Sequence, residues 1–428
     1  MLHRSALPPV QNPALEQLLP PPFVPPRYGE ASIANLPATV GNLLGVQEGW
    51  ASPALESNIL NAFGDDLERV VLLLVDSLGW TRLEEQLKRE DAGFSELLER
   101  HGVAHLPITS VAPSTTAVAT TVILGNGATP AETGMVGYAF LLAQLGVVAN
   151  MLFWYPAWKQ GGALGELETW GLKPETFLET PSVAEVLKSA NIATHVVMPE
   201  AYKDSPLSRM RPRAAEVEGY VNAADMWHKL GRWLEDTAGK KAYAYAYYPD
   251  FDTLSHRDGS DAPVWNALWF EFVFHLNRFV SGLSAQQRKK TLFLITADHG
   301  HVVMPVEGRQ FLQDYPRLLE LCSVMPGGET RHYYLYARSG CKKALLEYAQ
   351  THLSDIYVVL DTEEALQAGL YGNPARMHPD TPRRLGDVVL LAKGKGYLWG
   401  AEPERVLLGM HGSLLSDEMT VPLVALRP

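Results

Sequence analysis

The sequence predicts an α/β protein built on one mostly parallel sheet that is flanked by helices. Two observations carry this prediction. Short apolar runs with the length of buried strands recur along the 428 residues, and segments with apolar residues at helical spacing separate several of them. Strands that alternate with helices form βαβ units, whose parallel strands are covered on both faces. Hydrophobic residues make up 46% of the chain and charged residues 20%, which is typical of a globular protein with a large core.

Six short apolar runs are the candidate strands. They are VVLLLVD (70–76), THVVMP (194–199), AYAYAYYPD (242–250), TLFLITAD (291–298), DVVLLAK (387–393) and VPLVAL (421–426). Helices are predicted over 81–101 and 181–191, where apolar residues recur at helical spacing. A further helix, TAVATTVIL, is predicted to begin near residue 115, after Pro113 ends the preceding segment.

Two long intervals fit no regular βαβ unit. Residues 139–180 are rich in Trp, Tyr and Gly, and residues 301–385 hold a strand candidate of their own, RHYYLYAR. We interpret both as insertions that form a small cap over one edge of the sheet, and a separately folding domain is the alternative. Residues 1–36 are predicted to be a proline-rich arm, extended on the surface or disordered, because eight prolines fall in the first 26 positions. Residues 37–428 are then one domain.

Charge and cysteine content exclude several classes of protein. The net charge of −12 disfavours a stable nucleic-acid complex or binding to an anionic membrane, although metal ions can still hold a small anionic substrate. Cys322 and Cys341 match no zinc or redox motif and are expected to be reduced. No apolar run is long enough for a transmembrane helix or a signal peptide, so a cytoplasmic location is expected. The oligomeric state is not predicted.

Carboxylates and imidazoles follow the predicted strands. Three strands end in such groups and a fourth segment adds one; the residues are Asp76, Asp252, His256, Asp298, His299 and His411. A single Asp after a strand is usually a turn former or a helix cap. Parallel sheets, however, bind ligands outside the carboxyl ends of their strands, so these side chains are expected to meet. Three carboxylates and three imidazoles suit zinc, and also manganese or iron, and six ligands fit two ions with open positions.

The stretch APSTTAVATT offers a nucleophile beside such ions. A hydroxyl at the start of a helix lies where the helix dipole and the free N–H groups favour an anion. In the alternative interpretation, Ser114 or Thr115 is only an N-cap and Thr116 is merely helical. Because a divalent ion lowers the pKa of a coordinated hydroxyl, we favour a threonine alkoxide bound to metal.

These segments resemble the alkaline phosphatase superfamily, and most closely its type I phosphodiesterase/nucleotide pyrophosphatase branch. The resembling segments, in the order in which that branch has them, are VVLLLVDSLG, APSTTAVATT, PAETGMVGY, YYPDFDTLSHRDG, ITADHGH and GMHG. They span residues 70–412. The resemblance implies an alkaline-phosphatase-like sheet that carries a two-metal site.

The resemblance also implies how the ligands divide. One ion is held by Asp252, His256 and His411, and the other by Asp76, Asp298, His299 and the oxygen of Thr116. Thr116 is the implied nucleophile because it stands three residues after Pro113. Thr115 remains the alternative, since Asn126–Gly127 lies one residue further along than the family's Thr-Gly.

The implied function is metal-dependent hydrolysis of a phosphodiester or nucleotide pyrophosphate bond through a covalent phospho-threonine. The partner is then a small phosphate ester, a nucleotide included, and the cofactors are two divalent ions, with zinc favoured over manganese or iron. A phosphomonoesterase and a phosphonate hydrolase are alternatives on the same scaffold. A non-catalytic protein is the alternative of another class, against which the complete ligand set argues. Ala119 departs from the family, because many nucleotide pyrophosphatases have Asn there.

Three further features have two interpretations each. His301 either lines the site or has a supporting or surface role, and the latter is favoured. His378 either approaches the substrate from the second insertion or has no part in the site. The aromatic stretch LFWYPAW (152–158) either packs the cap or stacks a nucleobase.

Overall fold

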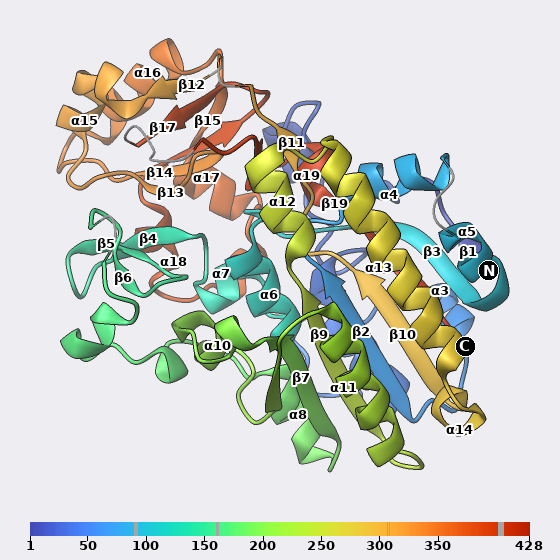
Figure 1. Ribbon diagram of the computed structural model, residues 1–428. Coiled ribbons are helices and arrows are strands. Elements are labelled where there is room, and N and C mark those ends of the chain that lie inside the picture. The colour runs from blue at the N-terminus through green and yellow to red at the C-terminus, as the bar shows by residue number, and fades with distance from the viewer. Residues whose placement is uncertain (90–92, 160–161, 306, 308, 401–405) are drawn as a thin grey trace.

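The computed structural model describes the whole chain except residues 90–92, 160–161, 306, 308 and 401–405. Its centre is one eight-stranded sheet with the strand order β1-β3-β19-β10-β2-β9-β7-β8 (Figure 1). In that order the strands span Leu2–His3, Gly102–Thr109, Thr420–Leu426, Thr291–Thr296, Arg69–Val75, Ala242–Tyr248, Ala193–Pro199 and Glu216–Tyr220. Neighbouring strands run parallel except at β19, which is antiparallel to both β3 and β10. The predicted α/β fold with a mostly parallel sheet is confirmed.

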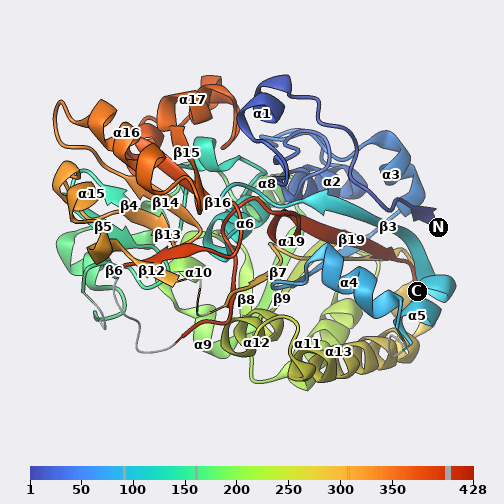
Figure 2. The same ribbon diagram turned by 90° about the horizontal axis from the view of Figure 1, so that it is seen from above.

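Helices cover both faces of this sheet (Figure 2). One face carries α4 (Trp80–Leu87), α5 (Phe94–His101), α11 (Ala223–Asp236), α12 (Asp250–Asp258) and α13 (Pro263–Gly282), and the other carries α2 (Leu36–Leu44), α3 (Ser57–Phe63), α6 (Thr116–Leu124) and α8 (Val183–Ser189). Because both faces are covered, every residue of β2 and β10 is buried. This explains why these strands appear in the sequence as continuous apolar runs.

The proline-rich arm packs against the same core. β1 pairs with β3 at the edge of the sheet, and α1 (Pro13–Leu18) follows. Leu15, Leu19 and Phe23 are buried in the main core. The arm is therefore held by the core at these points, which its proline content did not indicate.

Four elements differ from those expected. The strand predicted over 421–426 is present as β19, but it is antiparallel to both of its neighbours and not parallel. The helix expected over 81–101 is two helices, α4 and α5, and residues 90–92 of that range lie outside the described residues. β3 is not predicted because His105 and Pro107 interrupt its apolar pattern. The prediction of a parallel strand over 387–393 is wrong, because β16 (Val388–Ala392) runs antiparallel to β14 and β15 in a separate sheet. An apolar run shows that a strand is buried but not which sheet it joins.

Both insertion intervals contain small sheets of their own. The first holds β4, β5 and β6, at Ala139–Leu142, Val147–Asn150 and Tyr155–Pro156. The second sheet has the order β13-β14-β16-β15, in which β13 is Gly327–Glu329, β14 is His332–Leu335 and β15 is Tyr357–Asp361. Its helices are α15 (Pro316–Leu321), α16 (Lys342–His352), α17 (Thr362–Gln367) and α18 (Thr381–Leu385). Figure 1 shows the two sheets together on one side of the molecule.

The remaining elements are short. β11 (Val302–Val303) pairs with β18 (Gly409–Met410), and β12 (Arg309–Phe311) pairs with β17 (Tyr397–Trp399). The short helices are α7 (Pro130–Thr133), α9 (Glu200–Lys203), α10 (Pro206–Met210), α14 (Ala285–Arg288) and α19 (Ser416–Met419). Among the described residues, no helix has both the length and the apolar character needed to cross a membrane.

Candidate metal centre and active site

The predicted site residues meet at the carboxyl ends of three neighbouring parallel strands. Asp76 follows β2, Asp252 lies in α12 just beyond β9, and Asp298 follows β10. His411 arrives from the segment between β18 and β19, and Thr116 is the first residue of α6. The fold therefore gathers residues that are far apart in the chain, as the rule for parallel sheets requires.

One cluster consists of Asp76, Asp298 and His299, all of which are buried. His299 Nε2 lies 3.5 Å from Asp76 Oδ1 and 3.6 Å from Asp298 Oδ2. Both separations are too long for hydrogen bonds. They are close to the spacing of two ligand atoms that share a tetrahedral zinc ion, about 3.3 to 3.5 Å for metal–ligand bonds of about 2.0 to 2.1 Å. Thr116 Oγ1 lies 3.0 Å from the same nitrogen, so four atoms that could bind a metal ion converge.

Each carboxylate of this cluster uses one oxygen within the protein and leaves the other without a donor. Asp76 Oδ2 accepts from the Tyr247 hydroxyl, and Asp298 Oδ1 accepts from the backbone N–H groups of Ser77 and His299. The other oxygens, Asp76 Oδ1 and Asp298 Oδ2, are buried and have no hydrogen-bond partner among the described residues. Buried oxygens without a donor are costly. A cation between them removes that cost, so the residues present fit a bound divalent ion.

The raised pKa of Asp76 also indicates a site for a cation. Burial raises its pKa well above the usual value, and the carboxylates of Asp298 and Asp252 raise it further. Carboxylates that cannot easily ionise together are stabilised as anions when a divalent cation lies between them. The electrostatics therefore agree with the geometry.

The second cluster is centred on Asp252. The group whose ligand atoms lie close enough together for one ion is Asp252, His299, His301 and His411, and the predicted ligand His256 lies beside this group, not within it. Asp252 Oδ1 lies 3.4 Å from His256 Nε2, which is again a ligand-like separation, and 3.8 Å from His411 Nε2, which is longer than that spacing. His301 Nε2 is closer, at 2.8 Å. Burial pushes the pKa of Asp252 upward, but the three imidazoles outweigh burial and hold that pKa well below its usual value. The rings of His299 and His411 stack with their centroids 3.6 Å apart, so the two clusters adjoin.

Three of these imidazoles have the tautomer of a metal ligand. In His256, His299 and His411, Nδ1 lies within hydrogen-bond distance of a backbone carbonyl oxygen. The three acceptors are Gly409, Gly300 and Ser114, at 2.8, 3.1 and 2.9 Å respectively. A carbonyl oxygen only accepts, so each Nδ1 carries the proton and each Nε2 presents a lone pair. A ring held by a carbonyl at one nitrogen and free at the other is typical of metal-binding histidine.

The two candidate nucleophiles lie in different surroundings. Thr115 is the N-cap of α6 and is buried, and the Glu329 carboxyl lies against it. Thr116 is half-buried. Because His299 Nε2 carries a lone pair, the Thr116 hydroxyl donates to it across 3.0 Å. The structure thus brings Thr116 Oγ1, not the Thr115 hydroxyl, into the first cluster.

The segment that carries His411 is anchored to the second inserted sheet. Arg331 and Glu418 form a fully buried ion pair with an Nε–Oε1 distance of 2.6 Å. His332 Nδ1 lies 3.1 Å from the carbonyl oxygen of Gly412, the residue after His411. The interval 301–385 therefore supports the site from one side, which its sequence did not reveal.

His378 and the aromatic stretch 152–158, each of which has two interpretations from the sequence, lie apart from the clusters. His378 Nε2 lies 3.9 Å from Glu179, and its Nδ1 accepts from the backbone N–H of Asp380. Trp154 is fully buried against Phe177, so it packs the first inserted sheet. In the same aromatic stretch, Phe153 and Trp158 are exposed.

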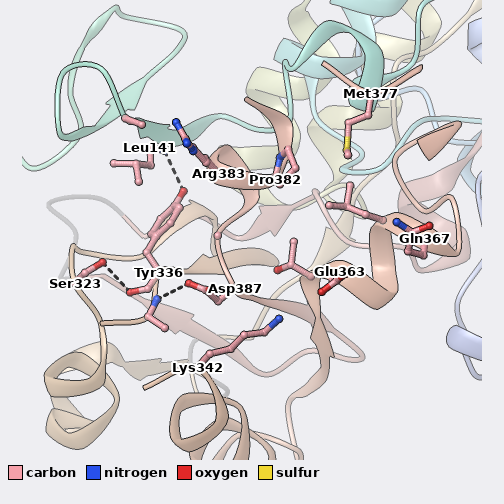
Figure 3. Close-up of a pocket in the computed structure, with 15 residues that line it drawn as sticks. Leu141, Ser323, Tyr336, Lys342, Glu363, Gln367, Met377, Pro382, Arg383 and Asp387 are labelled. Atoms are coloured by element: carbon pink, nitrogen blue, oxygen red, sulfur yellow. Dashed lines mark hydrogen bonds between the residues drawn. The ribbon is translucent and has the colours of Figure 1, made fainter. Parts of the chain in front are cut away.

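A cavity of about 560 Å³ also lies apart from the clusters, between the inserted sheets. Its lining includes Leu141, Tyr336, Lys342 and Arg383, and none of the predicted metal ligands (Figure 3). The Lys342 ammonium is paired with Asp361 at 2.8 Å. The cavity therefore takes no part in the chemistry of the two clusters.

Tyr247 is a functional candidate that the sequence analysis missed. It is the last residue on its face of β9, and its hydroxyl donates to Asp76 Oδ2, which turns Oδ1 toward His299. The signal in the sequence is the alternation in AYAYAYY, which places Tyr243, Tyr245 and Tyr247 on one face.

Tyr247→Phe is expected to loosen the metal held at Asp76. Removal of the donor frees the carboxylate to rotate, and loss of such an outer hydrogen bond costs about 10- to 100-fold in metal affinity or activity. Metal per chain, measured after dialysis against a graded chelator series, checks this. Tyr243→Phe is the matched control, because Tyr243 is buried on the same face of β9. Equal metal loss in both variants contradicts the assignment.

Comparison with known proteins places this geometry in a family. A family model described as type I phosphodiesterase/nucleotide pyrophosphatase matches residues 70–414. No curated protein matches the chain.

Three solved structures share the fold. Murine ectonucleotide pyrophosphatase/phosphodiesterase 5 has a TM-score of 0.61 at 18% identity, covering 83% of this chain and 87% of that one. An inactive variant of it in complex with AMP has a TM-score of 0.59 at 17% identity, covering 83% and 87%. Phosphonoacetate hydrolase from Sinorhizobium meliloti 1021, in complex with phosphonoformate, has a TM-score of 0.60 at 16% identity, covering 83% and 89%. The family model, together with this shared fold, shows that the chain is a hydrolase that belongs to the type I phosphodiesterase/nucleotide pyrophosphatase family of the alkaline phosphatase superfamily.

Proposed function

We propose that this protein hydrolyses phosphodiesters through a covalent phospho-threonine on Thr116, with two divalent ions, zinc by preference, as cofactors. The first ion is assigned to Asp76, Asp298, His299 and Thr116, and the second to Asp252, His256 and His411. One observation carries the proposal. The Thr116 hydroxyl oxygen and two carboxylate oxygens without hydrogen-bond partners lie 3.0, 3.5 and 3.6 Å from His299 Nε2, so all four atoms can bind one ion.

Thr116 and the start of α6 have separate roles in the proposed reaction. Thr116 Oγ1 gives up its proton and forms a bond to phosphorus while the bond from phosphorus to the leaving oxygen breaks. The leaving oxygen takes up a proton, so the leaving group departs as an alcohol and the remaining ester group stays on the phosphorus bound to Thr116. Water then cleaves the phospho-threonine and restores the hydroxyl. Bound ions would lower the pKa of the Thr116 hydroxyl and offset charge on the reacting oxygens. The first N–H groups of α6 have no partner within the helix and can donate to the non-bridging oxygens.

The charges around the clusters favour a diester over a monoester. Within the described residues, no Lys or Arg forms an ion pair with Asp76, Asp252 or Asp298. Arg211 lies under α6, where its guanidinium donates to Thr120 and to the Leu207 carbonyl. It is thus held one helical turn away from Thr116. Burial lowers the pKa of Arg211, and the Asp298 and Asp76 carboxylates are among the groups that oppose this, so Arg211 lies near the first cluster with its guanidinium already engaged. A diester has one negative charge on phosphorus and a monoester has two, so a site whose described cation is engaged in this way favours the diester.

The organic part of the substrate has an aromatic neighbour. Tyr202 is 41% exposed, and its ring centroid lies 6.3 Å from that of Tyr247. Burial raises the pKa of Tyr202, and the carboxylates of Asp76 and Asp252 add to the effect, which places the phenol near both clusters. Because an inactive variant of the murine relative was solved with AMP, compounds in which the phosphate of a nucleotide carries a second ester bond are the first natural diesters to test.

A side-by-side rate assay tests this proposal. Zinc-loaded protein is expected to cleave bis-p-nitrophenyl phosphate with a kcat/KM at least about tenfold above that for p-nitrophenyl phosphate, because an uncompensated charge costs on the order of 1 to 4 kcal/mol. Phosphonoacetate is the third substrate, since a phosphonoacetate hydrolase shares the fold. A preference for the monoester or the phosphonate contradicts the proposal.

A further inference from the structure

His301 differs from the other three imidazoles of the site in its hydrogen bonds. Its Nδ1 has no backbone carbonyl to donate to, and that nitrogen is buried with no partner among the described residues. The backbone of Gly409 closes it off, because a Cβ built on Gly409 would lie 2.8 Å from His301 Nδ1. This nitrogen is therefore shielded from bulk solvent, and none of the described residues provides it with a hydrogen-bond acceptor.

The tautomer of His301 follows from these surroundings. A proton on Nδ1 would be a buried N–H group without an acceptor, which is costlier than a buried lone pair. The proton therefore belongs on Nε2, which lies 2.8 Å from Asp252 Oδ1. A carboxylate only accepts, so the bond runs from His301 to Asp252.

The distance supports the same conclusion. Two ligand atoms on one tetrahedral zinc ion lie about 3.3 to 3.5 Å apart, whereas a charge-assisted N–H···O bond is about 2.7 to 2.9 Å long. Asp252 Oδ1 lies 3.4 Å from His256 Nε2 but only 2.8 Å from His301 Nε2. His256 therefore has the position of a fellow ligand, and His301 that of a hydrogen-bond donor.

We propose that His301 is a positioning residue that orients the Asp252 carboxylate for the second metal ion, without binding the ion itself. This inference rests on the proposed metal site. It assigns His301 a role opposite to that of His256, His299 and His411, although all four rings lie close together.

Two substitutions at position 301 separate this role from the alternatives. His301→Gln keeps an N–H donor at similar reach, and His301→Leu keeps volume but has no donor. We expect His301→Leu to lose about 10- to 100-fold in affinity for the second ion, with a matching fall in kcat. We expect His301→Gln to recover most of both. Affinity is measured as zinc per chain after dialysis against a graded chelator series. Folding is checked by the melting temperature of the metal-free protein.

Cobalt substitution and a ligand variant complete the test. His256→Ala removes a predicted ligand, so the visible spectrum of the Co²⁺ protein should change, whereas that of His301→Gln should match wild type. Two results would overturn the inference. One is a His301→Gln variant that loses metal and spectrum as His256→Ala does, which makes His301 a ligand. The other is wild-type metal affinity in His301→Leu. Failure of the proposed function is distinguishable, because it would appear in the wild-type protein, as a preference for another substrate or as an absence of metal, and not as a difference between the variants at position 301.

Discussion

Thr116→Ala is expected to reduce turnover of a phosphodiester by about 10⁴-fold or more, which corresponds to about 5.4 kcal/mol of lost transition-state stabilisation. The reason is that the variant has no oxygen to form the covalent intermediate. The hydroxyl lies 3.0 Å from His299 Nε2, and two carboxylate oxygens face the same nitrogen. Since three protein ligands remain in that cluster, metal content should stay close to that of wild type. Steady-state rates and metal analysis on the same preparations check both statements.

Thr115→Ala is the matched control. Thr115 is adjacent in sequence, has the same side chain and is buried beside Glu329. Its loss should reduce turnover by no more than about tenfold, because the Thr115 side chain makes no cap hydrogen bond to α6 and contacts Glu329 instead of the first cluster. Mass spectrometry of acid-quenched enzyme should locate the phosphoryl group on Thr116. An active Thr116→Ala together with an inactive Thr115→Ala would show that the nucleophile is one residue earlier.

The second large effect is expected from His411→Ala, which should lower the metal content from two ions to one per chain. His411 Nε2 lies 3.8 Å from Asp252 Oδ1, and its Nδ1 is held by the Ser114 carbonyl. Removal of one of three ligands leaves Asp252 and His256, which form an incomplete site for zinc. The first cluster keeps all of its ligands, so its ion should remain. Turnover should fall by several orders of magnitude, because both ions are required.

Two controls make this result specific. His378→Ala should keep both ions, because His378 contacts Glu179 and Asp380 and lies apart from the clusters. Asp298→Ala should empty the first cluster instead of the second. If His411→Ala retains two ions at full occupancy, the division of ligands between the clusters is wrong. The test is needed because the ring centroids of His299 and His411 lie only 3.6 Å apart, so proximity alone does not assign each imidazole to one cluster.

The fold class could be predicted from the sequence because its signals are local. A strand covered on both faces needs a continuous apolar run, as β2 and β10 have. The sheet that such a run joins is not local. β16 is as apolar as β2, yet it pairs with β14 and β15 in the inserted sheet. β3 was missed because Pro107 interrupts it, although β19 pairs with it along its length.

The sequence by itself determined which residue types stand at the strand ends, Asp76, Asp252 and Asp298 among them, because a strand and the residue that ends it are neighbours in the chain. Only the tertiary structure decided what each group does. Tyr247 turns Asp76, and backbone carbonyls fix the tautomers of His256 and His411. These partners come from other strands and loops, and a hydrogen bond depends on position and direction that no local pattern encodes.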